Sequence, residues 1–286
     1  MKARAFAYER PQTLDDAHAA FAAAEGDASY ISGGQSLVPA LAMRLQAPQM
    51  LIDLSAIADM KGMTVEGDVL RLGALTRHVD ALRHPLIAQH APLLAQAAPH
   101  VAHPAIRNRG TLGGSVSLAD PASEFPAMML AMGASMEIST PEGRTMVAAD
   151  DYFQDLYQTA LEPGDILVAL HIPCAQPHHR WAFEEMARRR GDYAMVGAGV
   201  MAQMDGDMVE SVRIAFFSVA ATPMRVAGAE AAITGQRLDA DSIKAAQRAL
   251  DGDLDPPEDA NLPAAMRKHL ARVLLGRLLN RLEATP

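Results

Sequence analysis

The chain has 286 residues, of which 50% are hydrophobic and 21% are charged, a composition typical of a globular protein rather than a disordered one. The formal net charge of −9 argues against a nucleic-acid partner, because phosphate neutralisation needs a basic face. The N-terminal residues MKARAFAYERPQ contain no apolar signal segment, and no run approaches the ~20 apolar residues of a membrane helix. We therefore expect no membrane span and a cytoplasmic location.

Cysteine content limits the redox chemistry of the chain. Cys174 is the single cysteine, so the chain can form no internal disulfide and cannot ligate an iron–sulfur cluster. Any cluster must therefore belong to another chain, and we expect Cys174 to be a small buried hydrophobic residue. The histidines show no metal-ligand pattern with cysteines or carboxylates, so no metal site is predicted.

The first half of the chain alternates strands and helices. Strands are expected at residues 3–8, 28–32 and 50–54, a helix at 13–25 with Thr13 as its N-cap, and a hairpin at 63–74 that turns at residues 66–68. Short helices are expected at 76–84 and 92–101. The length and this alternation predict two domains, the first of them built from both helices and strands.

The sequence of the second half of the chain predicts mainly strands, followed by helices at the C-terminus. We expect a helix at 123–134, strands at 135–140 and 144–149 around a turn at 141–143, and an apolar strand at 165–173. Residues 173–179 (PCAQPHH) form the predicted linker. Three antiparallel strands follow at 180–189, 194–204 and 208–220, and then three helices, the last at 264–283 with Leu270, Leu274, Leu278 and Leu282 on one face.

Two segments share one sequence pattern. In each, polar residues are followed by two consecutive glycines, a residue with a hydroxyl group and an apolar run typical of a helix. They are YISGGQSLVPALAMRL (30–45) and IRNRGTLGGSVSLADPASEFP (106–126). Consecutive glycines let the backbone approach a ligand, and successive N–H groups at such a turn can bind an anion. Two such segments could hold the two phosphates of a dinucleotide from opposite sides. The alternative is that each pair of glycines is only a tight connection.

Common catalytic glycine motifs do not fit these segments. There is no GxxxxGK[ST] sequence, and G-x-S-x-G fails at Ser36 and at Ser115. Residues 197–202 (GAGVMA) match G-x-G-x-x-A, but an Asp-Gly turn follows instead of a helix. We interpret those glycines as positions where a strand passes close to a ligand or another backbone.

Four segments together resemble the FAD-binding medium subunits of molybdenum hydroxylases, the family of carbon monoxide dehydrogenase and xanthine dehydrogenase. They are SGGQSLVPALAMRL, IRNRGTLGGSVSLADPASEFP, LEPGDILVALHIP and RRRGDYAMVGAGV. The resemblance spans almost the whole chain. It implies an α+β fold, with a vanillyl-alcohol-oxidase-type FAD-binding domain at 1–175, made of lobes at about 1–55 and 56–175, and a smaller antiparallel sheet-and-helix domain at 178–286.

The resemblance also implies roles around a non-covalently bound FAD. One side of the pyrophosphate would be surrounded by Ser32, Gly33, Gly34, Gln35, Ser36 and Leu37, and the other by Thr111, Gly113, Gly114 and Ser115. Glu124 stands where the family binds the adenosine ribose, Val101 and Val168 where it contacts the cofactor, and Tyr193 where a ring lies against the isoalloxazine. Gln35 replaces a histidine found in some relatives. No catalytic residue is implied.

Charged residues near the expected flavin add two expectations. Glu184 stands where some relatives have a lysine near the flavin, and a carboxylate there would lower the flavin potential. The alternative is that Glu184 and Glu185 form the solvent side of a strand. Arg107 and Arg109 are expected to face an acidic partner surface.

The resemblance predicts an FAD-carrying electron-transfer subunit of a heteromeric molybdenum hydroxylase. A large molybdopterin subunit would oxidise the substrate, a small subunit with [2Fe-2S] clusters would pass the electrons on, and this chain would deliver them to an external acceptor. Such heterotrimers could pair as a dimer. Two alternatives stay open: a self-sufficient flavoprotein oxidase or dehydrogenase, which needs a general base over the flavin, and a non-enzymatic nucleotide-binding module.

Overall fold

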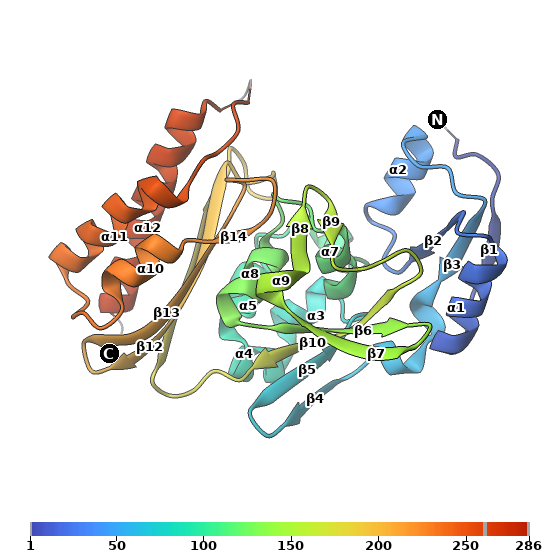
Figure 1. Cartoon of the computed structure of the whole chain (residues 1–286), viewed down its shortest axis with the longest axis horizontal. Coiled ribbons are helices and arrows are strands. Elements are labelled where there is room, and N and C mark those ends of the chain that lie inside the picture. The colour runs from blue at the N-terminus through green and yellow to red at the C-terminus, as the bar shows by residue number, and fades with distance from the viewer. Residues whose placement is uncertain (1, 260–261, 285–286) are drawn as a thin grey trace.

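The computed structural model describes residues 2–259 and 262–284. Three sheets follow one another along the long axis of the molecule (Figure 1): a small N-terminal sheet, a central sheet with its helices, and a C-terminal sheet backed by the last helices. The mixed helix and strand content confirms the predicted α+β class. Within the described residues, no helix has the length and apolar character that a membrane span requires.

The N-terminal part is a parallel sheet that positions the first Gly-Gly segment. Strands β1 (Ala7–Glu9), β2 (Ala28–Ile31) and β3 (Met50–Asp53) lie in the order β1-β3-β2, with helices α1 (Leu14–Ala23) and α2 (Leu37–Met43) in the connections. Thr13 caps α1 as predicted, because its Oγ1 accepts the N–H of Asp16 at 3.1 Å. The Gly-Gly segment leaves the carboxyl end of β2, the edge at which open parallel sheets bind ligands.

The central sheet is antiparallel, with strand order β4-β5-β10-β6-β7. Its strands are β4 (Met63–Glu66), β5 (Val69–Gly73), β6 (Ser135–Thr140), β7 (Gly143–Ala148) and β10 (Ile166–Pro173). Between β5 and β6 the chain forms α3 (His78–Arg83), α4 (Pro85–His90), α5 (Pro92–Ala97), α6 (Pro104–Arg107), α7 (Leu112–Leu118) and α8 (Glu124–Met132). Both predicted hairpins form: in β4–β5 the last pair before the turn is Glu66 with Val69, and in β6–β7 it is Thr140 with Gly143.

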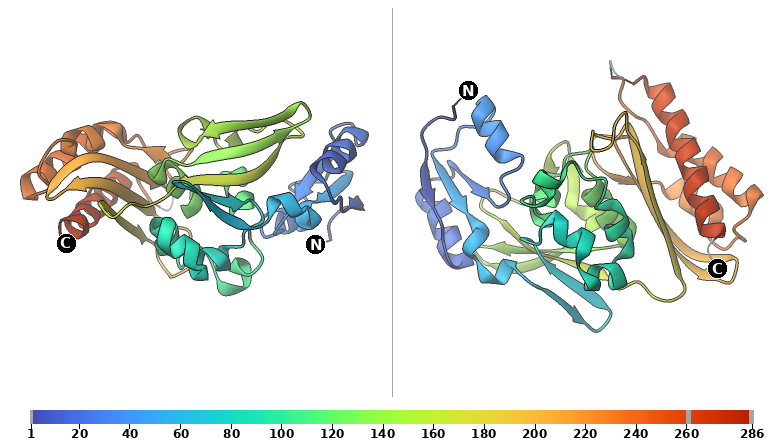
Figure 2. Two further views of the ribbon diagram at one scale, coloured as in Figure 1. Left: turned by 90° about the horizontal axis from the view of Figure 1, so that it is seen from below. Right: turned by 180° about the vertical axis from the view of Figure 1, so that it is seen from behind.

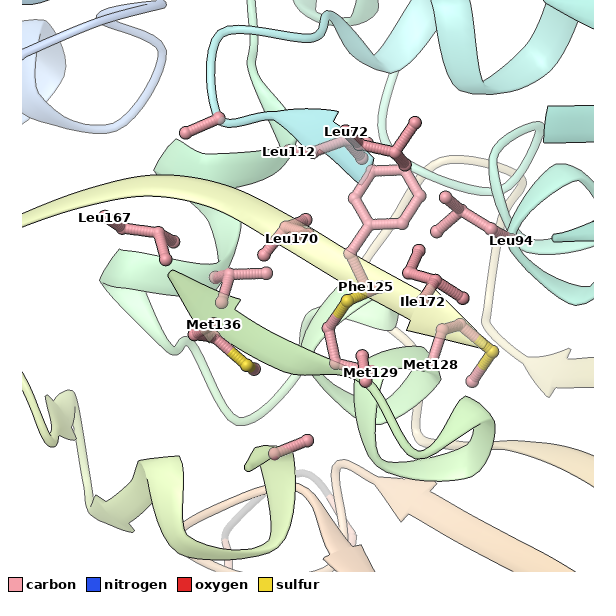
Figure 3. Packing of buried hydrophobic residues seen from close by; sticks show 14 of the residues in the cluster. Leu72, Leu94, Leu112, Phe125, Met128, Met129, Met136, Leu167, Leu170 and Ile172 are labelled. Carbon is pink, nitrogen blue, oxygen red and sulfur yellow. The ribbon is translucent and has the colours of Figure 1, made fainter. Parts of the chain in front are cut away.

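Helix α8 is the centre of the molecule. All nine of its residues are buried, as expected for a helix that is apolar on every side. Figure 3 shows Phe125, Met128 and Met129 packed against Leu170 and Ile172 of β10. The same apolar cluster includes Phe183 and Phe217 of the C-terminal sheet, so α8 joins the central and C-terminal parts.

The C-terminal part is a sheet with order β11-β12-β13-β14. Its strands are β11 (His179–Met186), β12 (Val196–Asp205), β13 (Met208–Phe217) and β14 (Met224–Arg225). Helices α10 (Ala227–Ile233), α11 (Ala240–Asp253) and α12 (Ala264–Glu283) cover the face turned away from the central part (Figure 2). The predicted leucine face of α12 packs there: Leu274, Leu278 and Leu282 are buried and Leu270 is half-buried.

Several elements differ from the expectation. The strand expected at 180–189 ends at Met186, and the next residues form a loop that reaches the central part. Sequence analysis missed α4, the short helix α6 and β14. It also missed helix α9 (Ala149–Tyr152), the small hairpin of β8 (Phe153–Asp155) and β9 (Gln158–Thr159), and two 3₁₀ turns at Leu54–Ala56 and Ala58–Met60. These elements are two to six residues long, too short for a hydrophobic period to appear.

Gly197 explains the rejected G-x-G-x-x-A match. It lies inside β12, and a Cβ atom there would lie 1.9 Å from Cζ of the fully buried Phe217 ring. The position in a strand was predicted, but the glycine makes room for a core aromatic ring rather than for a ligand or another backbone.

We expect Gly197→Ala to destabilise the fold by about 1–3 kcal/mol, because the added methyl group overpacks the core. Gly252→Ala is the matched control, since nothing lies within 4 Å of a Cβ built on that helical glycine. Its melting temperature should be unchanged or slightly higher. Thermal unfolding followed by circular dichroism measures both, and equal melting temperatures for wild type and Gly197→Ala would contradict the packing argument.

Candidate cofactor-binding site

The two Gly-Gly segments lie against each other. Ser32 Oγ and Thr111 Oγ1 are 3.0 Å apart, although 79 residues separate them in the chain. A Cβ atom on Gly33 would lie 2.3 Å from the carbonyl oxygen of Arg109, so the two backbones touch directly. Only glycine permits this approach. The sequence expectation that the segments act as one unit therefore agrees with the geometry.

The two segments differ in their free backbone donors. In the described part of the chain, no group accepts a hydrogen bond from the N–H of Gly34, Gln35 or Ser36. Gly34 has φ +69°, in the left-handed region that suits an anion-binding turn. The first segment therefore presents consecutive N–H groups, while Leu37, half-buried, begins α2 behind them.

The second segment uses its amides internally, which corrects the expectation that both segments are anion-binding turns. The N–H groups of Leu112 and Gly113 donate to the carbonyls of Thr76 and Ala74 at 2.8 and 2.9 Å. The N–H of Gly114 donates to Thr111 Oγ1 at 3.1 Å, which makes Thr111 the N-cap of α7. Gly113 and Gly114 thus lie in the first turn of the helix. This segment can offer hydroxyl groups, from Thr111 and the half-buried Ser115, rather than amides.

A cavity of about 460 Å³ lies beside the first segment. It is lined by Ile31, Ser32, Gly33, Gly34, Gln35, Val38, Pro39, Arg77 and Arg109. The two guanidinium groups give this cavity positive charge next to the free amides. Sequence analysis did not assign Arg77 to the site and placed Arg109 at a partner surface. Arg77 comes to the cavity through an isolated bridge with Thr111, a pairing that carries no local sequence signal.

His78 fixes the second segment from behind. Its ring Nε2 lies 3.0 Å from the carbonyl of Thr111, and its backbone N–H donates to Gly110 at 3.0 Å. Its ring packs edge-on against Phe125, with centroids 4.9 Å apart. Burial lowers the pKa of His78 to about 4, so the ring is neutral at physiological pH. His78 therefore positions Thr111 without adding charge.

Val101 and Val168 lie behind the site rather than in the cavity. Val168 is fully buried in β10, and its carbonyl accepts the N–H of Ala74, which in turn packs on Gly113. Val101 is 8% exposed, and its carbonyl accepts Nη1 of Arg107 at 2.8 Å. Arg107 also binds the carbonyl of Ala102, so it holds this turn and is not a free docking residue, contrary to expectation.

The charge of Asp120 acts on both Glu124 and Tyr193. Glu124 is the first residue of α8 and is 8% exposed, and burial, reinforced by the nearby charges of Glu185 and Asp120, raises its pKa to about 8. Tyr193 is exposed, and partial burial together with its interaction with Asp120 raises its pKa to about 12. The charge of Glu124 is a further, smaller cause of the raised pKa of Tyr193.

Glu184 does not reach this site, which corrects the sequence assignment. Its carboxylate pairs with Arg277 at 3.0 Å and with Arg281, both on α12. Neighbouring residues of a strand point to opposite faces, so Glu185 faces the central part, where its Oε1 lies 3.1 Å from Nδ1 of His100. The side chain of Glu185 is only 5% exposed, so it is not on a solvent face either. Its shared face with Phe183, two residues earlier, was the signal that sequence analysis missed.

Comparison with protein families matches both parts of the chain. Residues 4–175 match the model described as the FAD binding domain in molybdopterin dehydrogenase. Residues 181–282 match the model described as the CO dehydrogenase flavoprotein C-terminal domain.

Relatives with established names resemble the chain over nearly its full length. The carbon monoxide dehydrogenase medium chain of Afipia carboxidovorans is 35% identical over 98% of this chain and 97% of its own length. The nicotine 6-hydroxylase medium subunit of Paenarthrobacter nicotinovorans is 35% identical over 98% of each chain. A chain of the carbon monoxide dehydrogenase structure from Hydrogenophaga pseudoflava superposes with a TM-score of 0.97, at 34% identity and 99% coverage of both chains. The fold, the matched families and these relatives agree: the chain is an FAD-binding medium subunit of the carbon monoxide dehydrogenase type of molybdenum hydroxylases.

Proposed function

We propose that this chain carries electrons through its FAD, from a small [2Fe-2S] subunit to an external acceptor. The contact between the two Gly-Gly segments is the observation that carries the proposal, because it places free amides, hydroxyls and two arginines around one cavity. Bound FAD supplies the chemistry, since a flavin accepts and releases electrons singly or in pairs. A large molybdopterin subunit would oxidise the substrate, and the names of the relatives, medium chains and subunits, support such partners. The complex would work in the cytoplasm, with two heterotrimers forming a dimer.

The residues fit the phosphates of a dinucleotide. The N–H groups of Gly34, Gln35 and Ser36 would donate to the diphosphate, and Arg77 and Arg109 would balance its charge. Hydroxyl groups of Ser32, Thr111 and Ser115 complete the donor set. Gly33, Gly113 and Gly114 keep the backbones close, while Leu37, Val101 and Val168 support the cavity from behind.

The acidic and aromatic residues keep the roles that the resemblance implies. Glu124 would bind the adenosine ribose, and Tyr193, whose ring is exposed, would lie against the isoalloxazine. Binding is non-covalent, because residues 31–37 and 109–115 contain no histidine, tyrosine or cysteine that could bond to the flavin. The division into domains 1–175 and 178–286, with lobes at 1–55 and 56–175, is part of this proposal, supported by the separate sheets.

The isolated chain should bind FAD without oxidising any organic substrate. We expect the purified chain to be yellow, to release its flavin on acid precipitation, and to be reduced by dithionite but not by hydroxylase substrates. Absorbance spectroscopy measures all three. Bleaching by an organic substrate in a preparation free of partner chains would favour the self-sufficient oxidase. A colourless chain that binds ADP but not FAD would favour a nucleotide-binding module.

Valine at either glycine pair should prevent FAD binding. At Gly34, valine cannot adopt φ +69° without strain, and at Gly114 its Cβ would lie 2.8 Å from Thr111 Oγ1 and 3.0 Å from Ser32 Oγ. We expect Gly34→Val and Gly114→Val to lose bound flavin while keeping their circular dichroism spectra. Gly252→Ala should retain FAD at the wild-type ratio. Stoichiometric flavin in both valine variants would contradict the two-segment site.

Loss of the cavity arginines should weaken FAD binding. We expect Arg77→Gln and Arg109→Gln each to raise the Kd for FAD about tenfold, because each removes a charge-assisted contact to phosphate. The effect should shrink at high salt. Arg83→Gln, at the other end of α3, is the control and should leave the Kd unchanged. Titration of apoprotein with FAD measures these values, and equal effects at all three positions would argue for a nonspecific charge effect.

A further inference from the structure

The turn at residues 162–165, directly before β10, is a second place where the central part meets the N-terminal part. It belongs to one of the four segments that carry the family resemblance. The N–H of Asp165 donates to the carbonyl of Glu162 at 3.0 Å, and the N–H of Glu162 donates to Oδ2 of Asp165 at 3.0 Å. Gly164 is buried and has φ +98°, a conformation that glycine adopts readily. These features fix the direction in which the carbonyl of Gly164 points.

Two side chains of the N-terminal part donate to the carbonyl of Gly164. The hydroxyl of Tyr30, in β2, lies 2.9 Å from this oxygen, and ring Nδ1 of His18, in α1, lies 3.1 Å from it. Because a carbonyl oxygen only accepts, both groups carry the proton of their hydrogen bond. Burial raises the pKa of Tyr30 well above its usual value, so the phenol keeps that proton.

Ring packing and a further hydrogen bond complete this contact. The rings of Phe21 and Tyr30 stack with their centroids 5.4 Å apart, and a Cβ atom on Gly164 would lie 3.1 Å from Cδ1 of Phe21. His18 also reaches β6, where its Nε2 lies 2.9 Å from Oγ of the buried Ser139. We call these five residues the Gly164 contact. Three of them belong to the N-terminal part and two to the central part.

The Gly164 contact lies next to the first Gly-Gly segment along the chain. Tyr30 bonds to Gly164, and Ser32, only two residues later, lies 3.0 Å from Thr111. The end of β2 is therefore attached to two different places in the central part. Loss of either attachment leaves the other as a single point about which the N-terminal part can turn.

We propose that the Gly164 contact aligns the two halves of the FAD site, with Tyr30 and His18 as positioning residues for cofactor binding. The inference rests on the proposed function, because it needs a diphosphate between the amides of residues 34–36 and the two cavity arginines, which come from different parts. When the contact opens, the diphosphate meets only one of the two sets of donors. The affinity for FAD therefore falls as the fraction of chains with a closed contact falls.

The experiment removes one hydroxyl group from each of two tyrosines in the same sheet. Tyr30→Phe keeps the ring stack on Phe21 but loses the bond to Gly164, so we expect the Kd for FAD to rise about fivefold. Tyr8→Phe is the matched control, since the hydroxyl of Tyr8 donates to Asp53 within the N-terminal sheet. Its Kd should equal that of the wild type. Titration of each apoprotein with FAD measures the values.

A double-mutant cycle separates alignment from a general loss of stability. In a chain with Arg109→Gln, one of the donors that the contact aligns is already missing, so adding Tyr30→Phe should raise the Kd only about twofold. Substitutions of His18 give an independent test. The amide of His18→Asn can replace the Nδ1 donor and should keep the Kd near that of the wild type, whereas His18→Leu should behave like Tyr30→Phe.

Distances between spin labels report the alignment without FAD. Labels at Ala19→Cys in α1 and Gln89→Cys in α4, both exposed, are placed in a chain whose own cysteine is removed by Cys174→Ala. We expect Tyr30→Phe to broaden the distance distribution of the apoprotein, and FAD to narrow it again.

Three outcomes would overturn the alignment role alone: an unchanged Kd in Tyr30→Phe, equal losses in Tyr30→Phe and Tyr8→Phe, or the wild-type distance distribution in apo Tyr30→Phe. Equal effects of Tyr30→Phe with and without Arg109→Gln would reduce the contact to a purely structural one and so contradict the proposal. A wild-type chain that binds no FAD would instead overturn the proposed function, while the label distances would still test the Gly164 contact.

Discussion

The burial of α8 is the constraint on which the rest of the molecule depends. Because this helix is apolar on all sides, it is stable only when other elements surround it, and the central and C-terminal sheets do so. The fit is close: a Cβ atom on Gly199 would lie 2.6 Å from the side chain of Met128. The glycines of β12 therefore serve α8 and Phe217, not a nucleotide. Because α8 is buried, its first residue, Glu124, is buried as well.

From α8 the contacts lead outward to the cofactor segments in three steps. Phe125 supports the ring of His78, His78 holds the carbonyl of Thr111, and the hydroxyl of Thr111 meets that of Ser32. Each step is a contact between residues that are distant in sequence. The core thus sets the position of the second Gly-Gly segment, against which the first segment and its free amides lie, and so the position of the proposed phosphate-binding surface.

Features predicted correctly from the sequence were those with local signals. Thr13 capped its helix, the turns at 66–68 and 141–143 closed hairpins, and the two Gly-Gly segments belonged together. The errors came from long-range pairing. Glu184 was assigned to the flavin, but its neighbours across space turn it toward α12 and leave Glu185 facing the central part. The amides of Leu112 and Gly113 donate to carbonyls nearly 40 residues upstream, and Arg77 donates to the carbonyl of Asn108, 31 residues away. The partners of Arg107 are close in sequence, at Pro99, Val101 and Ala102, but no pattern of residue types indicates such a side-chain contact to the backbone.

The contact between Ser32 and Thr111 has a consequence for the order of folding. It joins the segment after β2 to the N-cap of α7, and the backing of Gly113 by Ala74 depends on the carbonyl of Val168 in β10. The proposed phosphate-binding surface is thus incomplete until β10 has been synthesised and inserted between β5 and β6. Contacts of such large sequence separation form late, because their loop-closure entropy is lost before they stabilise the fold. On the proposed site, cofactor loading during biosynthesis would follow, rather than guide, the folding of the first 173 residues.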